Sequence, residues 1–188
     1  CSQLAESPIE SVSIECMGDI EDSKPIALSF LIGLIQNMTD TKINFVNASI
    51  IAQERGMDFS HTLASESVAF TNLVRITLIT KEEDNITLEG SVFGKQNFRV
   101  VNIFGYELDF QPEGNMLFLQ NKDVPGVIGK VGMLLSGSSV NIGEYLLSRT
   151  TSKKKAYSVI KVDGQVNSDL INKLMQIDEI LSVKQISL

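Results

Sequence analysis

The segment from Asn115 to Gly129 constrains the fold most, because it has the pattern of a strand that runs through a polar loop into a helix. Met116 to Leu119 is a continuous apolar run, which is typical of a buried strand. Pro125 suits the first turn of the helix that follows, and Asp123 stands where a short acid can cap its free N–H groups. The loop therefore has the chemistry to hold a small zwitterion, although an ordinary capped turn is the simpler interpretation of this loop alone.

The chain after Gly114 predicts a complete small domain. Its pattern gives the order βαββαβ, which is the ferredoxin-like plan of an antiparallel sheet with both helices on one face. The second strand of that plan lies at a sheet edge, where unpaired backbone groups can meet a second copy of the chain. The expected strands are 115–120, 140–149, 156–162 and 180–186, and the expected helices are 125–136 and 168–176.

The first half of the chain predicts a separate α+β domain with an antiparallel sheet backed by two helices. Asp22-Ser23-Lys24-Pro25 is a helix start signal, and the helix is expected to reach Met38. Residues 60–69 are polar and are expected to form mainly a loop or a weak strand. The other expected elements are strand 11–16, a short helix between Asn47 and Gly56, and strands 73–80, 86–93, 99–103 and 106–110.

Gln111-Pro112-Glu113-Gly114 is the predicted linker, because proline and glycine both interrupt strand pairing. We therefore expect one domain at 9–111 and a second at 115–188, with residues 1–8 as the end of a preceding linker. The chain begins with Cys1 rather than Met, which suggests a piece of a longer polypeptide.

Composition excludes several classes of function. The 188 residues are 43% hydrophobic and 21% charged, as expected for a soluble globular chain. A formal net charge of -7 argues against binding to nucleic acid. No apolar run has membrane-spanning length, and the start lacks the features of a signal peptide. Cys1 and Cys16 lack the spacing of a metal site or a disulfide framework, which suits a reducing cytoplasm.

Catalytic motifs are missing from the sequence. His61 is the only histidine, and neither a glycine-rich elbow nor an oxyanion loop accompanies it and its neighbours Ser60 and Thr62. A surface or hydrogen-bonded histidine is therefore the better interpretation. The nucleotide-binding glycine motifs are also missing. Lys153-Lys154-Lys155 fits a solvated hairpin tip. The sequence favours a binding or regulatory module over a free-standing enzyme.

Three polar residues remain as candidates for ligand binding. Asn121 and Asp123 lie in the first loop of the second half, and Asn141 lies at the start of the next strand. Pairing of the edge strands across a two-fold axis would bring the loop of one copy towards Asn141 of its twin. A ligand bound there would touch both subunits and report its presence through the interface. The alternative is that Asn141 simply caps a turn after Ser138-Ser139.

Two parts of the sequence resemble known families. Residues 121–132, followed by Val140-Asn141-Ile142, closely resemble the opening of an ACT regulatory domain. The preceding half resembles the intervening domain of long-form D-3-phosphoglycerate dehydrogenase. The resemblance covers nearly the whole chain, and its pieces in the first half are residues 9–12, 46–48, 51–56, 90–94, 99–101 and 109–114.

The resemblance implies a regulatory region of an enzyme that oxidises 3-phosphoglycerate with NAD in the first step of L-serine synthesis and is inhibited by L-serine. The catalytic domains of that family precede this region, so no catalytic residue, metal or cofactor is expected here. It further implies a cytoplasmic homodimer and leaves a tetramer open. Carried over by motif, the effector-binding residues would be Asn121, Asp123, Pro125, Gly126, Val127, Ile128, Asn141 and Ile142.

Some relatives bind an anion in the intervening domain through several basic residues. This chain keeps Lys95 and Arg99 but has Tyr106 and Gln111 where those relatives have basic residues. A surface role for Lys95 and Arg99 is therefore an equal alternative to an anion site.

Two other functions stay open at this point. The chain also resembles the small subunit of an iron–sulfur L-serine dehydratase. Ser60-His61-Thr62 of this chain matches the serine-rich histidine motif of that family only in part. The third possibility is a dimerisation module that binds no ligand, which would use the same edge strand.

Overall fold

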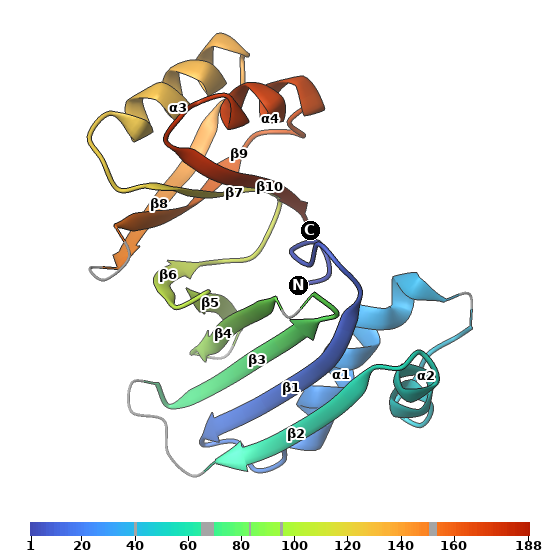
Figure 1. Ribbon diagram of the computed structural model, residues 1–188. Coiled ribbons are helices and arrows are strands. Elements are labelled where there is room, and N and C mark those ends of the chain that lie inside the picture. The colour runs from blue at the N-terminus through green and yellow to red at the C-terminus, as the bar shows by residue number, and fades with distance from the viewer. Residues whose placement is uncertain (40, 65–69, 83, 95, 151–153) are drawn as a thin grey trace. The chain divides into compact units, whose positions relative to one another are not determined.

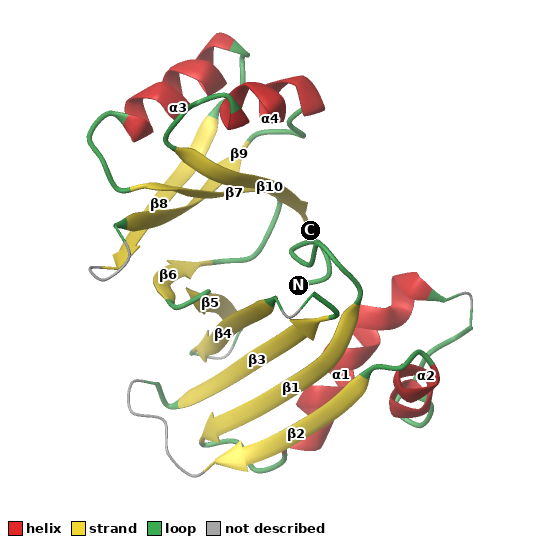
Figure 2. Ribbon diagram, viewed as in Figure 1, coloured by secondary structure: helices red, strands yellow, loops and turns green. Residues whose placement is uncertain are grey.

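A computed structural model describes residues 1–39, 41–64, 70–82, 84–94, 96–150 and 154–188 (Figure 1). The chain divides into two compact units, Cys1–Gly105 and Tyr106–Leu188. Both contain helices and strands, so the predicted α+β class is confirmed (Figure 2). Within the described ranges, every helix is too short or too polar to cross a membrane.

The first unit begins with a strand, two helices and a second strand, and three further strands complete it. A short 3₁₀ turn, Gln36–Met38, extends the first helix, so the predicted end at Met38 is confirmed only as a tighter turn. The elements are β1 (Ile9–Gly18), α1 (Ser23–Ile35), α2 (Ala48–Glu54), β2 (Asp58–Ala64), β3 (Asn72–Thr80), β4 (Asn85–Phe93) and β5 (Asn97–Ile103).

The helix α1 starts as the sequence predicts. The side chain of Asp22 accepts a hydrogen bond from the backbone N–H of Lys24 at 2.9 Å, which satisfies one of the free donors of the first turn. Ala27, Leu31 and Leu34 recur at helical spacing and are buried. This apolar face packs against the sheet, and Figure 1 shows both helices of the unit on one side of β1 and β2.

The predicted antiparallel sheet of this half is confirmed for β1, β3, β4 and β5, but the pairing of β2 differs from it. The six-stranded sheet has the order β2-β1-β3-β4-β5-β6, where β6 is Tyr106–Phe110, and β1 pairs with β2 in parallel, with Ile14 opposite His61. The chain returns to the same edge through α1 and α2, and such a helical crossover makes neighbouring strands parallel. Residues 60–64 are accordingly a regular strand rather than a loop, while residues 65–69 lie outside the described ranges.

The second unit opens with β6 (Tyr106–Phe110), which follows β5 through the two-residue turn Phe104-Gly105. The rest has the predicted βαββαβ order, with the four-stranded antiparallel sheet β10-β7-β9-β8 and both helices on one face (Figure 1). β8 lies at an edge, as predicted. The elements are β7 (Asn115–Lys122), α3 (Val127–Gly137), β8 (Ile142–Thr150), β9 (Lys155–Val162), α4 (Ser168–Met175) and β10 (Ile180–Ser187).

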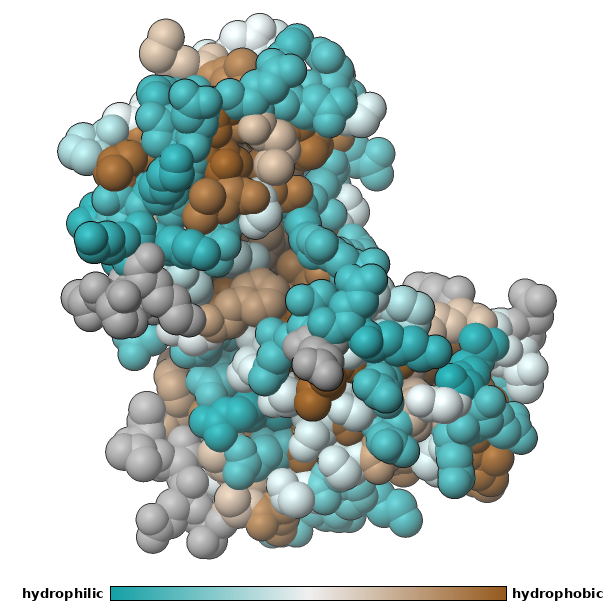
Figure 3. Space-filling model, in the orientation of Figure 1, coloured by the Kyte–Doolittle hydropathy of each residue, from teal (hydrophilic) through white to brown (hydrophobic). Residues whose placement is uncertain are grey.

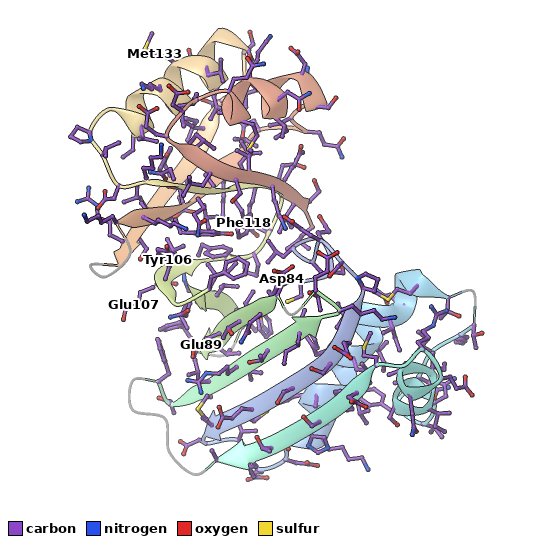
Figure 4. The ribbon with its side chains drawn as sticks, viewed as in Figure 1. Asp84, Glu89, Tyr106, Glu107, Phe118 and Met133 are labelled. Atoms are coloured by element: carbon purple, nitrogen blue, oxygen red, sulfur yellow. The ribbon has the colours of Figure 1, made fainter. Side chains whose placement is uncertain are left out.

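The sheet of the second unit is covered on both faces. The helices cover Leu117 and Leu119 of β7 on one face. On the other face, Tyr106 of β6 stacks on Tyr157, and Phe110 meets Phe118 edge-on, with ring centroids 5.3 Å and 5.9 Å apart. Figure 4 shows Tyr106 and Phe118 on the side of the sheet away from the helices. Burial on both faces explains why residues 116–119 are all apolar rather than alternating.

Candidate functional site

Asn121 is a buried amide at the end of β7, with 2% of its surface exposed. Side chains alternate along a strand, so it shares the helix-covered face with Leu117 and Leu119. Its Nδ2 donates to the carbonyl of Lys122 at 2.7 Å, while its Oδ1 has no partner in the described part of the chain. A buried acceptor without a donor is costly, so this oxygen suits a ligand that brings an N–H or O–H group.

Asp123 follows in the exposed loop and contacts the edge strand. Its Oδ1 lies 3.3 Å from Nε of Arg149 on β8. Its backbone N–H donates to the carbonyl of Lys154 at 3.0 Å, which fastens the loop to the start of β9. Arg149 is not among the residues that the sequence predicts for this site. The signal was the predicted topology, because β7 and β8 both run antiparallel to β9 and so end at the same side of the sheet.

The cap of α3 differs from the prediction. Gly126, rather than Asp123, precedes the helix, and it offers no side-chain hydrogen bond. Its φ of 93° lies in the left-handed region that glycine adopts without strain, which explains a glycine at this turn. Pro125 lies before the helix rather than within its first turn. The change leaves the first N–H groups of α3 without a capping side chain.

The first turn of α3 presents its N–H groups beside the loop. The first backbone hydrogen bond of the helix runs from the Lys130 N–H to the Gly126 carbonyl at 3.0 Å, so the N–H groups of Val127, Ile128 and Gly129 precede it. Val127 is anchored in the core, whereas Ile128 is half exposed. Such N–H groups, at the positive end of the helix dipole, favour an anionic group of a ligand.

An ion pair holds this helix end in place. Nζ of Lys130 lies 2.6 Å from Oε1 of Glu179, and the Lys122 N–H donates to the Glu179 carbonyl at 2.8 Å. The hydrogen bond from Lys130 is the main cause that lowers the pKa of the Glu179 carboxyl below its ordinary value. Glu179 thus connects the end of β7 with the start of α3 around the loop.

Asn141 and Ile142 lie at the opposite end of the sheet. Asn121 pairs with Ala156 near the start of β9, whereas Asn141 donates through Nδ2 to Oδ2 of Asp163, after the end of β9, at 2.8 Å. Seven residue steps of strand separate Ala156 from Asp163, which amounts to about 23 Å. Ile142 packs partly buried against the core. One copy of the chain therefore brings together residues 121–128 but not Asn141.

An open hollow of about 490 Å³ lies beside the Asn141 end, between the starts of β7 and β8 and the end of β9. Lys161 lies in its wall, with Nζ 3.6 Å from Glu113 and 3.5 Å from Glu144. The two acids outnumber the one cation, and Asp163 in the same wall accepts a hydrogen bond from Asn141, so the charged groups of this hollow are paired with one another.

Comparison with known proteins identifies the first unit. Residues 1–104 match the family model of the D-3-phosphoglycerate dehydrogenase intervening domain. The chain belongs to this family. The family match ends before Tyr106, so all the residues of the candidate effector site lie outside it.

Relatives extend the similarity over the remaining residues. A D-3-phosphoglycerate dehydrogenase of Bacillus subtilis is 29% identical over 189 residues, which is 100% of this chain and 36% of the relative. Those of Mycobacterium leprae and Mycobacterium tuberculosis H37Rv are each 30% identical, over 89% and 88% of this chain and 32% of their own length. The chain thus spans about one third of the relatives that it matches.

Other polar residues of the family domain are accounted for by local contacts. Nδ1 of His61 lies 2.9 Å from Oγ of Ser23, so the prediction of a hydrogen-bonded histidine is confirmed. Arg99 is half-buried on β5, and Lys95 lies outside the described residues, so the anion site stays a prediction. Burial, together with the nearby Asp22 carboxylate, raises the pKa of the Cys16 thiol. Among the described residues, no group of side chains has the composition of a metal site.

Proposed function

We propose that this chain is a regulatory part of a cytoplasmic D-3-phosphoglycerate dehydrogenase of L-serine biosynthesis. In this proposal, residues 115–188 form an ACT domain that binds L-serine as a feedback effector between two copies. The NAD-dependent oxidation of 3-phosphoglycerate would belong to other parts of the parent polypeptide. The observation that carries the proposal is the buried Oδ1 of Asn121, which has no partner among the described residues, beside Asp123 and the N–H groups of α3 that no described side chain caps.

The site offers partners for the ammonium group and the carboxylate of L-serine. The ammonium group can donate to the Asn121 Oδ1 and approach the Asp123 carboxylate, which accepts hydrogen bonds only. The carboxylate suits the N–H groups at Val127 and Ile128, and the Asn141 amide of a second copy would add a donor. The half-exposed loop leaves a path for the amino acid to enter, with Pro125 and Gly126 forming its turn.

A two-fold pairing of the edge strands would complete such a site. If β8 of one copy pairs antiparallel with β8 of another, the Ile142 end of one strand lies beside the Arg149 end of its partner. The Asn141 end of each copy would then approach the loop of its twin, which one copy alone cannot achieve. Two such dimers would form the tetramer that the family resemblance leaves open.

Calorimetric titration with L-serine tests this proposal, with D-serine and glycine as controls and sedimentation to show that the sample is dimeric. Asp123→Ala should abolish the heat of binding. Asp169→Ala is the matched control, because it also removes an acid from an exposed ion pair, with Lys173 on α4, and it should bind normally.

The remaining outcomes distinguish the alternatives. A stable dimer that releases no heat and keeps the same melting temperature with every amino acid would instead show the ligand-free dimerisation module that the exposed edge of β8 also fits. The iron–sulfur dehydratase subunit is disfavoured by the family match of residues 1–104.

A further inference from the structure

We infer that Arg149 recognises the carboxylate of the bound amino acid and thereby restricts the site to zwitterions. This inference rests on the proposed function, because it names a further residue of the same site. Nothing in the sequence motif of the loop points to Arg149, which lies more than twenty residues after Gly126 and reaches the loop only through the fold.

The contact of Arg149 with Asp123 leaves most of the guanidinium available. Nε is the atom nearest to the Asp123 carboxylate, at 3.3 Å. The arginine side chain is 64% exposed. In the described part of the chain, its ion pair is with Asp123. A guanidinium has five N–H donors in a planar fork, which matches the two oxygens of a carboxylate. The Nη groups can therefore take a second carboxylate while Nε stays near Asp123.

The charges explain why a zwitterion is the best occupant. In the free chain, Asp123 and Arg149 neutralise each other. An amino acid brings one charge of each sign, so its ammonium group can face Asp123 while its carboxylate faces Arg149. A simple amine would place its cation near Arg149 without a compensating anion, and a simple carboxylic acid would place its anion near Asp123. Such like-charge contacts disfavour the wrong ligand more than they strengthen the right one.

The position of Arg149 also connects the ligand to the edge of the sheet. The residue is the last but one of β8, and the Asp123 N–H bonds the Lys154 carbonyl at the start of β9. A ligand that shares both members of the ion pair therefore contacts the α3 loop and the edge strand together. This arrangement can transmit occupancy of the loop to the strand that would pair with a second copy.

The test compares L-serine with L-serinamide, which replaces the carboxylate by a neutral amide, at a pH where both amines are protonated. The unmodified chain should prefer L-serine by about tenfold or more, the size expected for one charge-assisted hydrogen bond. Arg149→Gln should lose most of that preference while it keeps its weaker affinity for L-serinamide. Lys173→Gln, which removes a half-exposed cation from an ion pair on α4, is the matched control and should keep the full preference.

Each outcome is decisive. Retained preference for L-serine in Arg149→Gln would overturn the role of Arg149 and leave the proposed function standing. Failure of the unmodified dimer to bind any amino acid would overturn both. If Arg149→Gln does not fold, Arg149→Lys supplies the same measurement, because lysine keeps the charge but lacks the planar fork. An intermediate preference in Arg149→Lys supports the inference, and an unchanged preference contradicts it.

Discussion

The two units satisfy their polar groups in different ways. In the first unit, Arg75 lies between two acids on neighbouring strands, 2.7 Å from Glu15 and 2.7 Å from Glu89. Ser91 donates to the Asn72 carbonyl at 2.7 Å, and the Asn72 side chain accepts from the Val92 N–H at 3.0 Å. These groups form pairs and small networks that need nothing from outside the unit.

Around the loop of the second unit, the polar groups are only partly satisfied. The Oδ1 of Asn121 and the Oε2 of Glu179 are buried without a partner in the described part of the chain. The ion pair of Asp123 with Arg149, at 3.3 Å, is longer than a close charge-assisted hydrogen bond, and no described side chain caps the first N–H groups of α3. The difference teaches that these polar residues of the first unit stabilise the unit itself, whereas the loop of the second unit leaves acceptors and donors unused among the described residues, as the proposed effector site requires.

Truncation of the apolar cores should affect both units alike and gives the largest effects. Ile14 in β1 and Leu119 in β7 are completely buried. Ile14→Ala and Leu119→Ala should each lower the free energy of unfolding of their own unit by about 2–5 kcal/mol, because each leaves a cavity. Denaturant unfolding measures this, and Ile50→Ala, at an exposed position on α2, should change it by less than about 0.5 kcal/mol.

Removal of Arg75, which pairs with two acids, should destabilise the first unit by less than the core truncations do. Arg75→Met keeps the length of the side chain but leaves Glu89, which is mostly buried, without its cation. We expect a loss of about 1 kcal/mol, since the side chains are partly exposed and their attraction is weakened by solvent. Thermal unfolding in low and high salt checks this, because the loss should shrink as salt screens the unmodified network. A loss independent of salt would show that packing, not charge, is responsible.

Replacement of the buried amide in the second unit should cost little in the free chain. Asn121→Leu removes an unsatisfied acceptor and keeps a side chain of similar size, so the free energy of unfolding should change by less than about 1 kcal/mol. The same change should abolish the heat released with L-serine. A loss of more than about 2 kcal/mol without ligand would mean that the Asn121 amide stabilises the fold. Asn121 would then resemble the polar residues of the first unit, and the contrast between the units would not hold for it.

The smallest effect is expected at Glu179, and it should depend on pH. The pKa of this carboxyl is lowered in the folded chain, so its stabilising contribution is complete above the ordinary value of 4.5 and is lost as the pH falls through the folded value. Glu179→Gln should therefore lower the melting temperature at pH 6 and have almost no effect at pH 3. An equal effect at both pH values would show that the contribution of the Glu179 side chain comes from its packing and not from its charge.

The sequence predicts the second unit well because its patterns are local. The apolar run 116–119, the helical spacing after Gly126 and the alternation in β9 fix the order of its elements. The parallel partner of β1 was missed, because Ser60, His61 and Thr62 give a polar edge strand that lacks the apolar alternation of a buried one. The sequence predicts the turn at Pro125 and Gly126. That Gly126 and not Asp123 directly precedes the helix follows only from the backbone conformation.

The parts of the candidate site that the sequence does not predict are those that depend on tertiary structure. Arg149 meets Asp123 only because two strands end at one side of the same sheet. The sequence likewise does not predict that Oδ1 of Asn121 lacks a partner among the described residues, since a buried asparagine usually accepts a hydrogen bond. Motifs thus locate the loop, whereas only the tertiary structure shows which of its atoms lack a partner among the described residues.

The length of the sheet has a consequence for any measurement on this chain. Because Asn121 and Asn141 stand at opposite ends of one sheet, an effector site that needs both exists only after two chains have met. The concentration of complete sites would then rise with the square of the chain concentration in dilute samples, and the fraction of chains that share such a site would rise in proportion to it. A very dilute preparation would need more of the amino acid for the same response, because the ligand must also draw two chains together, and concentrating the chain would lower that dose.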